Sequence, residues 1–267
     1  MVDDGSSDHT EDVVNAANEN IRFLHQENSG ASAARNLGAA YAQGDYLAFL
    51  DSDDIWFPWT LQIASDLIEA HTPAVLSGAL FPFEQESELT NIQASEPNAD
   101  VYADYFESCM PGCFVGAGMA FIKRDAFLGS GGFTTDIVNC EDHDLMLKLG
   151  TEQGFVNIKS PPTIAWRRHA GSTTNNCQLS LNGVKHLLQS ECEGRYPGGS
   201  DRRHARRQII NSHVRPVSLD CLRGQLTSEA WQLYRTTLSW HIQQRRVKYL
   251  LGFPMRYLQR QLSGEAS

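Results

Sequence analysis

The chain has 267 residues, of which 41% are hydrophobic and 20% are charged, and this composition excludes collagen-like and disordered proteins. Its formal net charge of −10 excludes a general nucleic-acid binder, because neutralising phosphates requires clustered lysine and arginine. The six cysteines are scattered through a chain too long to need disulfide staples, which predicts reduced thiols and a cytoplasmic location.

Helices and strands alternate through the first half of the chain. A turn at residues 2–8 precedes a predicted helix that ends near Asn18, and a short strand at 21–24 precedes a helix of small residues at 31–43. The apolar run at 46–50 has the length of a buried strand. This alternation favours a parallel sheet covered by helices on both faces.

The later predicted elements continue the α/β pattern and then become helical. In chain order they are a helix over 58–69, a strand over 74–81, a polar loop and candidate lid over 84–100, a strand over 116–123, a helical turn over 124–128, a helix from 141 to about 149, strands over 155–158 and 163–168, helical sequence from about 176, and a long helix over 225–246. The last segment, 247–262, mixes apolar residues with Lys248, Arg256 and Arg260. Such a segment could contact an anionic membrane surface, but we favour a helical cap that packs on the preceding α/β domain.

An acidic motif follows the buried strand at 46–50. Ligands bind at the carboxyl ends of strands in open α/β sheets, and Asp51 and Asp53 lie two residues apart at such an end. Their carboxylates could hold Mg²⁺ or Mn²⁺, which prefer oxygen ligands and often share them with substrate phosphates. The alternative is an ordinary turn, in which aspartate is common.

Two further motifs could contact a nucleotide. A carboxylate of Asp3 or Asp4 could accept a hydrogen bond from a nucleobase N–H, while Gly5 would let the backbone approach closely. Arg35 lies in a helix of small residues and could contact a base or a phosphate. Each motif alone also fits an ordinary turn or a tightly packed helix.

The motifs after residue 140 suggest acid–base chemistry. Glu141 and Asp142 open a helix, where acidic residues usually complement the helix dipole. Asp142 could instead be the general base for an acceptor hydroxyl, and the dipole is expected to keep it ionised. In the loop 166–173, the imidazole of His169 could bind a metal or a diphosphate, or could be structural.

Taken together, five segments closely resemble the inverting family 2 glycosyltransferases, which have a GT-A fold. The segments read VDDGSSDHT, ENSGASAARNLG, YLAFLDSDD, GMAFIKRDAFLGSGGF with EDHDLMLKL, and RRHAGSTT. The resemblance implies a mixed sheet flanked by helices in a catalytic domain over 1–175, followed by a helical extension over 176–267.

The resemblance also implies a role for each motif. Asp3 and Asp4 would contact the nucleoside with the help of Arg35, and Glu141 would contribute to substrate binding. Asp51 and Asp53 would form the DxD pair, with Asp53 the direct metal ligand. Asp142 would be the catalytic base, and His169 would lie near the diphosphate.

The implied reaction is a single displacement that inverts the sugar and requires Mg²⁺ or Mn²⁺. A UDP-sugar is the expected donor, with GDP- and dTDP-sugars as alternatives. The acceptor would be a saccharide or a lipid-linked saccharide in polysaccharide assembly. No nucleic-acid partner is expected. Peripheral contact with the inner face of the membrane would occur through the C-terminal helix.

One departure from the family pattern and two competing functions remain. Family members normally carry a strand and a helix, about 30 residues, before the VDDGS turn; without them this chain is expected to be a fragment that folds poorly or is inactive. It could also be a non-catalytic binder of sugar nucleotides. A phosphohydrolase of the haloacid dehalogenase type also uses Asp-x-Asp, but usually has Thr or Val where this chain has Ile55.

Overall fold

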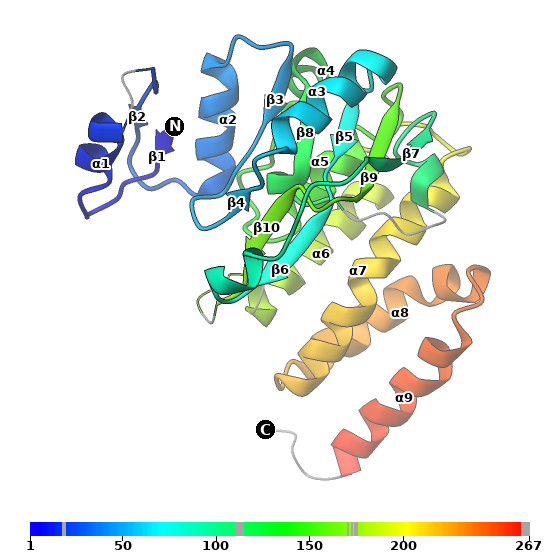
Figure 1. Cartoon of the computed structure of the whole chain (residues 1–267). Coiled ribbons are helices and arrows are strands. Elements are labelled where there is room, and N and C mark those ends of the chain that lie inside the picture. The colour runs from blue at the N-terminus through cyan, green and yellow to red at the C-terminus, as the bar shows by residue number, and fades with distance from the viewer. Residues whose placement is uncertain (18–19, 110–114, 170, 172, 174–175, 263–267) are drawn as a thin grey trace.

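The computed structural model describes residues 1–17, 20–109, 115–169, 171, 173 and 176–262 (Figure 1). Its largest sheet has five strands in the order β3-β8-β5-β9-β7. These strands are β3 (Tyr46–Ala48), β5 (Val75–Ser77), β7 (Asn98–Tyr102), β8 (Ala120–Lys123) and β9 (Phe155–Ser160). Only β5 and β9 pair in parallel; the other three pairs are antiparallel. The sheet is therefore mixed, as the family resemblance implied, and the parallel sheet inferred from alternation alone is wrong.

Two smaller sheets flank the large one. Strand β1 (Val2–Asp3) pairs in parallel with β2 (Leu24–His25). The other sheet has the order β4-β10-β6. Its members are β4 (Ile55–Trp56), β6 (Leu80–Phe83) and β10 (Ile164–Arg167).

Helices cover both faces of the large sheet, as predicted. They include α2 (Ala31–Tyr41), α3 (Thr60–His71), α4 (Arg124–Gly129) and α5 (Glu141–Lys148), whereas α1 (Thr10–Ala17) lies beside β1 and β2 (Figure 1). Because successive side chains of a strand point to opposite faces, Val75 and Ile122 join the core under α5, whereas Leu76 and Phe121 pack with Ile63 of α3. The two apolar layers hold the strand ends at fixed positions.

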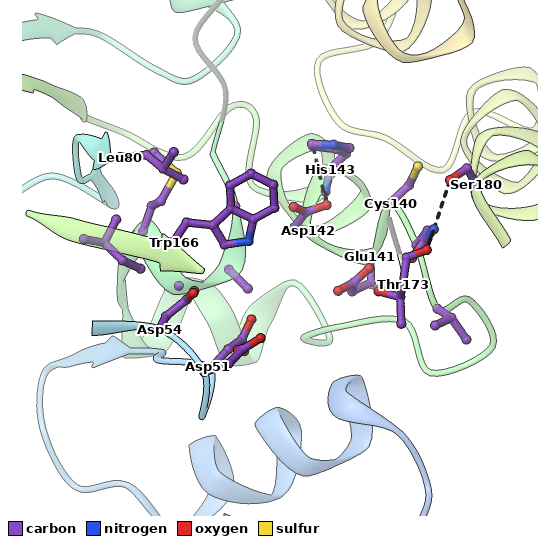
Figure 2. Close-up of a pocket in the computed structure, with 18 of the residues that line it drawn as sticks. Asp51, Asp54, Leu80, Cys140, Glu141, Asp142, His143, Trp166, Thr173 and Ser180 are labelled. Carbon is purple, nitrogen blue, oxygen red and sulfur yellow. Dashed lines mark hydrogen bonds and ion pairs between the residues drawn. The ribbon is translucent and has the colours of Figure 1, made fainter. Parts of the chain in front are cut away.

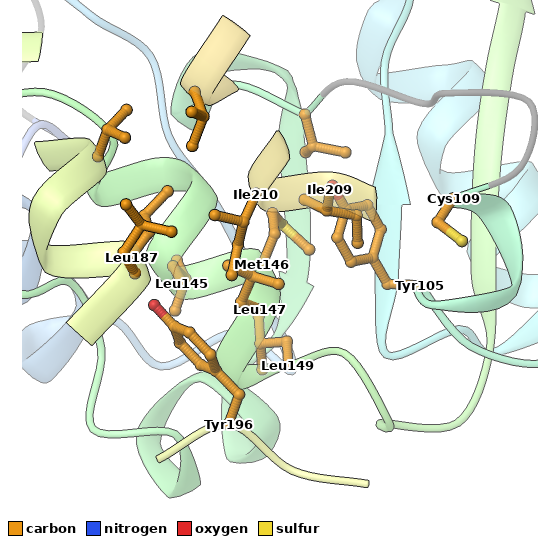
Figure 3. Close-up of a cluster of buried hydrophobic side chains, with 14 of the residues drawn as sticks. Tyr105, Cys109, Leu145, Met146, Leu147, Leu149, Leu187, Tyr196, Ile209 and Ile210 are labelled. Atoms are coloured by element: carbon orange, nitrogen blue, oxygen red, sulfur yellow. The ribbon is translucent and has the colours of Figure 1, made fainter. Parts of the chain in front are cut away.

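The C-terminal part consists of four helices in the described residues. They are α6 (Cys177–Cys192), α7 (Arg203–Arg223), α8 (Thr227–Gln243) and α9 (Val247–Leu262). Figure 3 shows Leu145 of α5 packed with Leu187 of α6 and Ile210 of α7 in one buried cluster. A buried ion pair between Arg206 and Glu191, 2.6 Å long, ties α7 to α6. The helical extension thus shares its core with the preceding segment, and the boundary at 175 stays a prediction.

Some predicted elements require correction. The segment 84–100 is not a continuous loop, because it contains a 3₁₀ helix (Glu86–Leu89) and the start of β7. The strand predicted over 74–81 is divided at Gly78, where any side chain would meet Thr163 Oγ1 at 2.3 Å, so it forms β5 and β6. The predicted strand over 116–123 begins as a 3₁₀ helix (Ala117–Met119).

Two remaining observations concern the described residues as a whole. The five cysteines among them are free thiols, as predicted. None of the described helices combines the length and the apolar character needed to cross a membrane.

Candidate functional site

A cavity of about 610 Å³ lies where the loop after β3, the start of α5 and the middle of α7 meet. Figure 2 shows Asp51 and Asp54 on one side of it, with Glu141 and Asp142 across from them. The structure brings six residues predicted from the sequence into its lining: Arg35, Asp51, Asp53, Glu141, Asp142 and His169. Residues as far apart in sequence as Arg35 and His169 therefore converge, and the roles assigned to them stay predictions.

The acidic turn after β3 is held by aromatic packing beneath it. Phe49 leaves the strand and contacts the rings of Phe127 and Phe133, with centroids 5.5 and 5.3 Å away. The chain then turns back, and the N–H of Asp54 donates to the carbonyl of Asp51 over 3.1 Å. Buried rings fix the base of the turn, so its carboxylates extend from the edge of the sheet.

Arg35 of α2 links the acidic turn to α5. Its Nη2 donates to Asp51 Oδ1 over 2.6 Å and its Nη1 to Glu141 Oε1 over 3.1 Å. Its side chain is only 13% exposed. Burial alone would lower the pKa of the guanidinium, but the two carboxylates outweigh burial and raise it. Arg35 is thus a fixed positive charge that holds two acidic segments together.

Asp53 presents its carboxylate to the cavity. The Oδ2 atom lies 3.0 Å from Nε2 of His169, and both side chains remain nearly half exposed. The backbone carbonyl of Asp53 accepts a hydrogen bond from Arg167 Nε over 3.0 Å. This contact fixes the turn and leaves the carboxylate oxygens of Asp53 accessible.

Asp54 is the most deeply placed carboxylate of the turn. Burial raises its pKa to about 6, with repulsion from Asp53 and Asp51 in the same direction. Its Oδ1 accepts the backbone N–H of Arg167 over 2.9 Å, which offsets part of that effect. Sequence reasoning gave Asp54 no role, although it lies inside the recognised acidic motif.

The start of α5 is fixed by a turn that the sequence did not reveal. Cys140 precedes the helix in a left-handed conformation, with φ of 70°. The side chain of Asn139 donates to the carbonyl of Thr173 and to Ser180 Oγ, each over 3.0 Å. A β-carbon on Gly183 of α6 would lie 2.0 Å from the carbonyl oxygen of Asn139. This close backbone approach requires glycine and sets where Glu141 and Asp142 begin.

Glu141 and Asp142 are both harder to ionise than exposed carboxyl groups. Burial raises the pKa of each, and repulsion between the two adds to the shift for Glu141. The backbone N–H of His143 donates to Asp142 Oδ1 over 2.7 Å and opposes the shift, as does Arg35. The sequence interpretation relied on the helix dipole, but burial is the larger effect and brings the pKa of Asp142 to about 6.

Two histidines on the cavity wall were not predicted. His143 of α5 and His213 of α7 stack with their ring centroids 3.6 Å apart. Burial lowers the pKa of both rings, that of His143 to about 4, so both are neutral near pH 7. His143 lies inside the recognised EDHD motif, whereas His213 belongs to no recognised motif and carries no sequence signal.

Asp3 and Asp4 are not among the residues that line the cavity. The carboxylate of Asp3 accepts hydrogen bonds from the N–H and hydroxyl of Ser6 and lies 2.7 Å from Nδ1 of His25. Asp4 accepts the N–H groups of Ser29 and Gly30 over 2.8 Å each. These contacts secure the chain directly before α2, the helix that carries Arg35.

The residues fit a divalent cation only in part. Among the described residues, no group of three or more His, Cys, Asp or Glu side chains is arranged to hold a metal ion. Asp53 and His169 nevertheless place an oxygen and an imidazole nitrogen together at the cavity, both accessible. Asp51 is engaged by Arg35. An ion held here would need further oxygen ligands from substrate and water, as Mg²⁺ commonly does.

Residues 1–129 match the family model described as Glycosyl transferase family 2. Over this part of its sequence the chain is similar to the family 2 glycosyltransferases. The matched residues contain the acidic turn and Arg35, whereas Glu141, Asp142 and His169 lie beyond them. The resemblance to family 2 glycosyltransferases that the sequence segments predicted is thus confirmed for residues 1–129.

Similar glycosyltransferases occur in several bacteria. The chain is 26% identical over 193 residues to the Escherichia coli protein named UDP-Glc:alpha-D-GlcNAc-diphosphoundecaprenol beta-1,3-glucosyltransferase WfaP, covering 71% of this chain and 73% of that protein. It is 27% identical over 169 residues to an uncharacterized glycosyltransferase of Haemophilus influenzae, covering 60% and 56% of the two chains. A Rickettsia felis glycosyltransferase is 39% identical over 71 residues, which are 26% of this chain and 12% of that protein.

A solved structure shows the fold. Residues 1–349 of Staphylococcus aureus TarS, crystallised with UDP-GlcNAc, superpose with a TM-score of 0.63 at 15% identity, covering 79% of this chain and 62% of that one. The GT-A fold expected from the family resemblance is therefore confirmed.

Proposed function

We propose that this glycosyltransferase moves a sugar from a nucleoside diphosphate to an acceptor hydroxyl, with inversion at the anomeric carbon. The observation that carries the proposal is that Asp53 and Asp142 line one cavity from different elements. A single displacement needs a group that binds the leaving diphosphate and a base on the opposite side of the sugar. Two carboxylates in one cavity can supply these two functions.

Asp53 and His169 form the donor side of the site in this proposal. They would hold Mg²⁺ or Mn²⁺, and such an ion, when bound, would neutralise the charge on the leaving diphosphate. Asp51 would support the ion indirectly, because its carboxylate is bound by Arg35. The names of WfaP and of the TarS complex mention UDP-Glc and UDP-GlcNAc, and they support a UDP-sugar as the donor.

Asp142 is the proposed general base. A pKa of about 6 keeps it mainly ionised at neutral pH. This pKa is also closer to the operating pH than that of an exposed aspartate, and a general base works best when the two are similar. It would take the proton of the acceptor hydroxyl as that oxygen bonds to the anomeric carbon and the nucleoside diphosphate departs. The N–H of His143 would orient the carboxylate. Glu141 would bind substrate and hold Arg35 in place.

The nucleoside would lie beside the first loops of the chain. Asp4 secures Ser29 and Gly30 directly before α2, so Asp3 and Asp4 would shape this side of the site, and α2 brings Arg35 to it. We include nucleoside contact by both aspartates in the proposal on the strength of the family resemblance.

The acceptor would enter on the side formed by α7. Pro216 and Val217 line the cavity there with His213, so the helical extension over 176–267 would contribute to the acceptor site of a catalytic domain over 1–175. The name of WfaP specifies an acceptor linked to diphosphoundecaprenol. It supports a saccharide, in particular a lipid-linked one, as the acceptor and polysaccharide assembly as the setting.

The test compares two neighbouring carboxylates. Nucleoside diphosphate release is measured for a panel of nucleotide sugars with Mn²⁺, for the native chain, Asp142→Asn and Glu141→Gln. Loss of the base should lower kcat by about 1,000-fold, while Glu141→Gln, which can still accept from Arg35, should retain more activity. Native rates in Asp142→Asn would refute the assigned base. A protein that only binds sugar nucleotides would instead show thermal stabilisation without turnover in any variant.

A further inference from the structure

Helix α9 has two apolar faces, and only one packs against the protein. On the inner face, Phe253 is buried against Tyr234 of α8, with ring centroids 4.9 Å apart, and Tyr257 stacks on Trp231 at 4.6 Å. The hydroxyl of Tyr249 lies 2.8 Å from Ser218 Oγ of α7. These contacts make α9 a helical cap on α7 and α8, whereas the sequence favoured a cap on the preceding α/β domain, and they fix the orientation of α9.

The second apolar face points away from these contacts. It consists of five large side chains that are 57–86% exposed: Val247, Leu251, Met255, Leu258 and Leu262. They follow one another at intervals of three or four residues, which places them on one side of the helix. We call them the outer stripe. Figure 1 shows α9 at the periphery of the molecule, as its last helix. A contiguous exposed apolar stripe of this kind marks an interaction surface.

The charge around the outer stripe is the opposite of the charge of the whole chain. The chain carries a net charge of −10, yet residues 230–262 contain no Asp or Glu and six basic residues: Arg235, Arg245, Arg246, Lys248, Arg256 and Arg260. Lys248 and Arg256 are exposed on α9 itself. An apolar stripe beside basic side chains matches the pattern of helices that lie in the interface of an anionic bilayer.

A second copy of the chain fits this surface less well. Two α9 helices packed through their stripes would place Lys248 of each copy at the edge of the contact, and the excess of positive charge around the stripe opposes such a contact. We propose that α9 docks on an anionic membrane surface, with the outer stripe among the acyl chains and the basic residues at the lipid phosphates. The proposed binding partner of the outer stripe is thus an anionic phospholipid membrane.

Docking through α9 would also orient the cavity. Tyr249 contacts α7 at Ser218, and Pro216 and Val217 on the same helix line the cavity. The wall formed by α7 is therefore fixed relative to the bound membrane, where a lipid-linked acceptor would be delivered. Only this last step rests on the proposed function; docking itself does not.

The test is co-sedimentation of the full chain with vesicles, without any nucleotide sugar. Vesicles of phosphatidylcholine with one quarter phosphatidylglycerol should bind the protein, and pure phosphatidylcholine should bind it far more weakly. Lys248→Gln with Arg256→Gln should weaken binding about 25-fold, since each basic side chain contributes about fivefold. Leu251→Glu should weaken it by at least about tenfold. Leu61→Glu is the matched control, because Leu61 is a similarly exposed leucine on α3, 59% against 66%.

Three outcomes would overturn the proposal. These are no binding to anionic vesicles, equal binding by native protein and Leu251→Glu, and self-association in analytical ultracentrifugation that Leu251→Glu abolishes. The last would assign the stripe to a second copy. Because no donor or acceptor is present, failure here is distinguishable from failure of the proposed transfer reaction.

Discussion

Two groups of carboxylates in this protein show how surroundings change the behaviour of one side chain. The first group is Asp3, at the end of β1, and Asp4, which follows it; both lie among hydrogen-bond donors. The second group lies around Asp54 and Asp142 in the cavity, among apolar atoms and other acidic side chains. Hydrogen bonds from Ser6 and His25 lower the pKa of Asp3, whereas burial raises that of Asp54 and Asp142. Asp4 combines the two effects: burial raises its pKa, but its three donors outweigh burial and lower it.

The difference separates carboxylates that stabilise the fold from carboxylates available to a ligand. Asp4 is satisfied by the chain itself, so its charge supports local structure. The cavity carboxylates keep unfavourable charge close together, and Arg35 offsets part of it for Asp51 and Glu141. Groups whose pKa is raised by burial in a cavity are candidates for proton transfer or ligand binding.

The largest effect is expected from removing Arg35. Arg35→Ala would leave Asp51 and Glu141 unpaired and should destabilise the protein by about 2–3 kcal/mol. This is less than the cost of breaking a fully buried ion pair, because the side chain of Asp51 is 42% exposed. Thermal unfolding should show a fall in Tm of about 5–10 °C. Arg235→Ala, which removes an exposed arginine from α8, is the control and should change Tm little.

The same variant tests the electrostatic coupling to Asp142. At present Arg35 lowers the pKa of Asp142, so activity should rise with pH through about 6 in the native chain as the base ionises. Without Arg35, this rise in activity, the acidic limb of the kcat–pH profile, should move to higher pH. An unshifted limb in the kcat–pH profile would show that Asp142 is not the titrating base.

A smaller loss is expected when the donor side of the cavity is changed. Asp53→Asn keeps the size of the side chain but removes its charge. The Mn²⁺ concentration for half-maximal activity should therefore rise by at least about 100-fold, because even the hydrogen-bond partners of metal ligands change metal affinity by about 10–100-fold. Asp66→Asn, an exposed carboxylate on α3, is the control for net charge. Equal Mn²⁺ dependence in native and Asp53→Asn proteins would remove Asp53 from the proposed metal site.

In the N-terminal group the expected effect is mainly structural. Asp4→Ala removes the acceptor for the N–H groups of Ser29 and Gly30 and should lower stability by about 1–2 kcal/mol. Because these residues directly precede α2, KM for the donor should rise while kcat changes less. Urea unfolding and steady-state kinetics measure the two effects. A variant with native stability and a strongly reduced kcat would contradict the distinction between the two groups.

The smallest effect is a gain in stability at Asp54. Its folded-state pKa of about 6 exceeds the usual 3.8, so the folded protein binds this proton more tightly, and the group's contribution to stability decreases as pH rises from about 4 to 6. Asp54→Asn can still accept the N–H of Arg167 and should stabilise the protein by about 1 kcal/mol at pH 8, but not at pH 4. Chemical unfolding at the two pH values checks this; equal effects at both would contradict it.

Sequence patterns were sufficient for elements whose signals are local. The helix start at Glu141 was predicted where α5 begins, and the acidic turn was identified because it follows a buried strand. β7 was missed because it lies in a polar, proline-containing segment and is ordered by pairing with β9, a contact distant in sequence. α7 lies in the predicted helical extension, but its basic, proline-containing sequence gave no bounds for the helix, which is stabilised by packing on α6 and α8.

Six of the residues that line the cavity were named from the sequence, but their partners were not. The family segments named Arg35, Asp51 and Glu141, yet nothing in the sequence indicated that one guanidinium joins the other two residues. The stacking of His143 on His213 likewise depends on how α7 crosses α5. Such pairings arise from tertiary packing, which a residue pattern does not encode.

The contact of Gly183 with Asn139 has a consequence for how mutational scans of this protein are interpreted. Even a methyl group at 183 would displace the turn before α5, and the two carboxylates that begin the helix would move with it. A scan scored by activity should therefore rank this glycine of α6 with the reacting groups, although it takes no part in the chemistry. Its intolerance would report a steric requirement transmitted through the backbone to the start of α5.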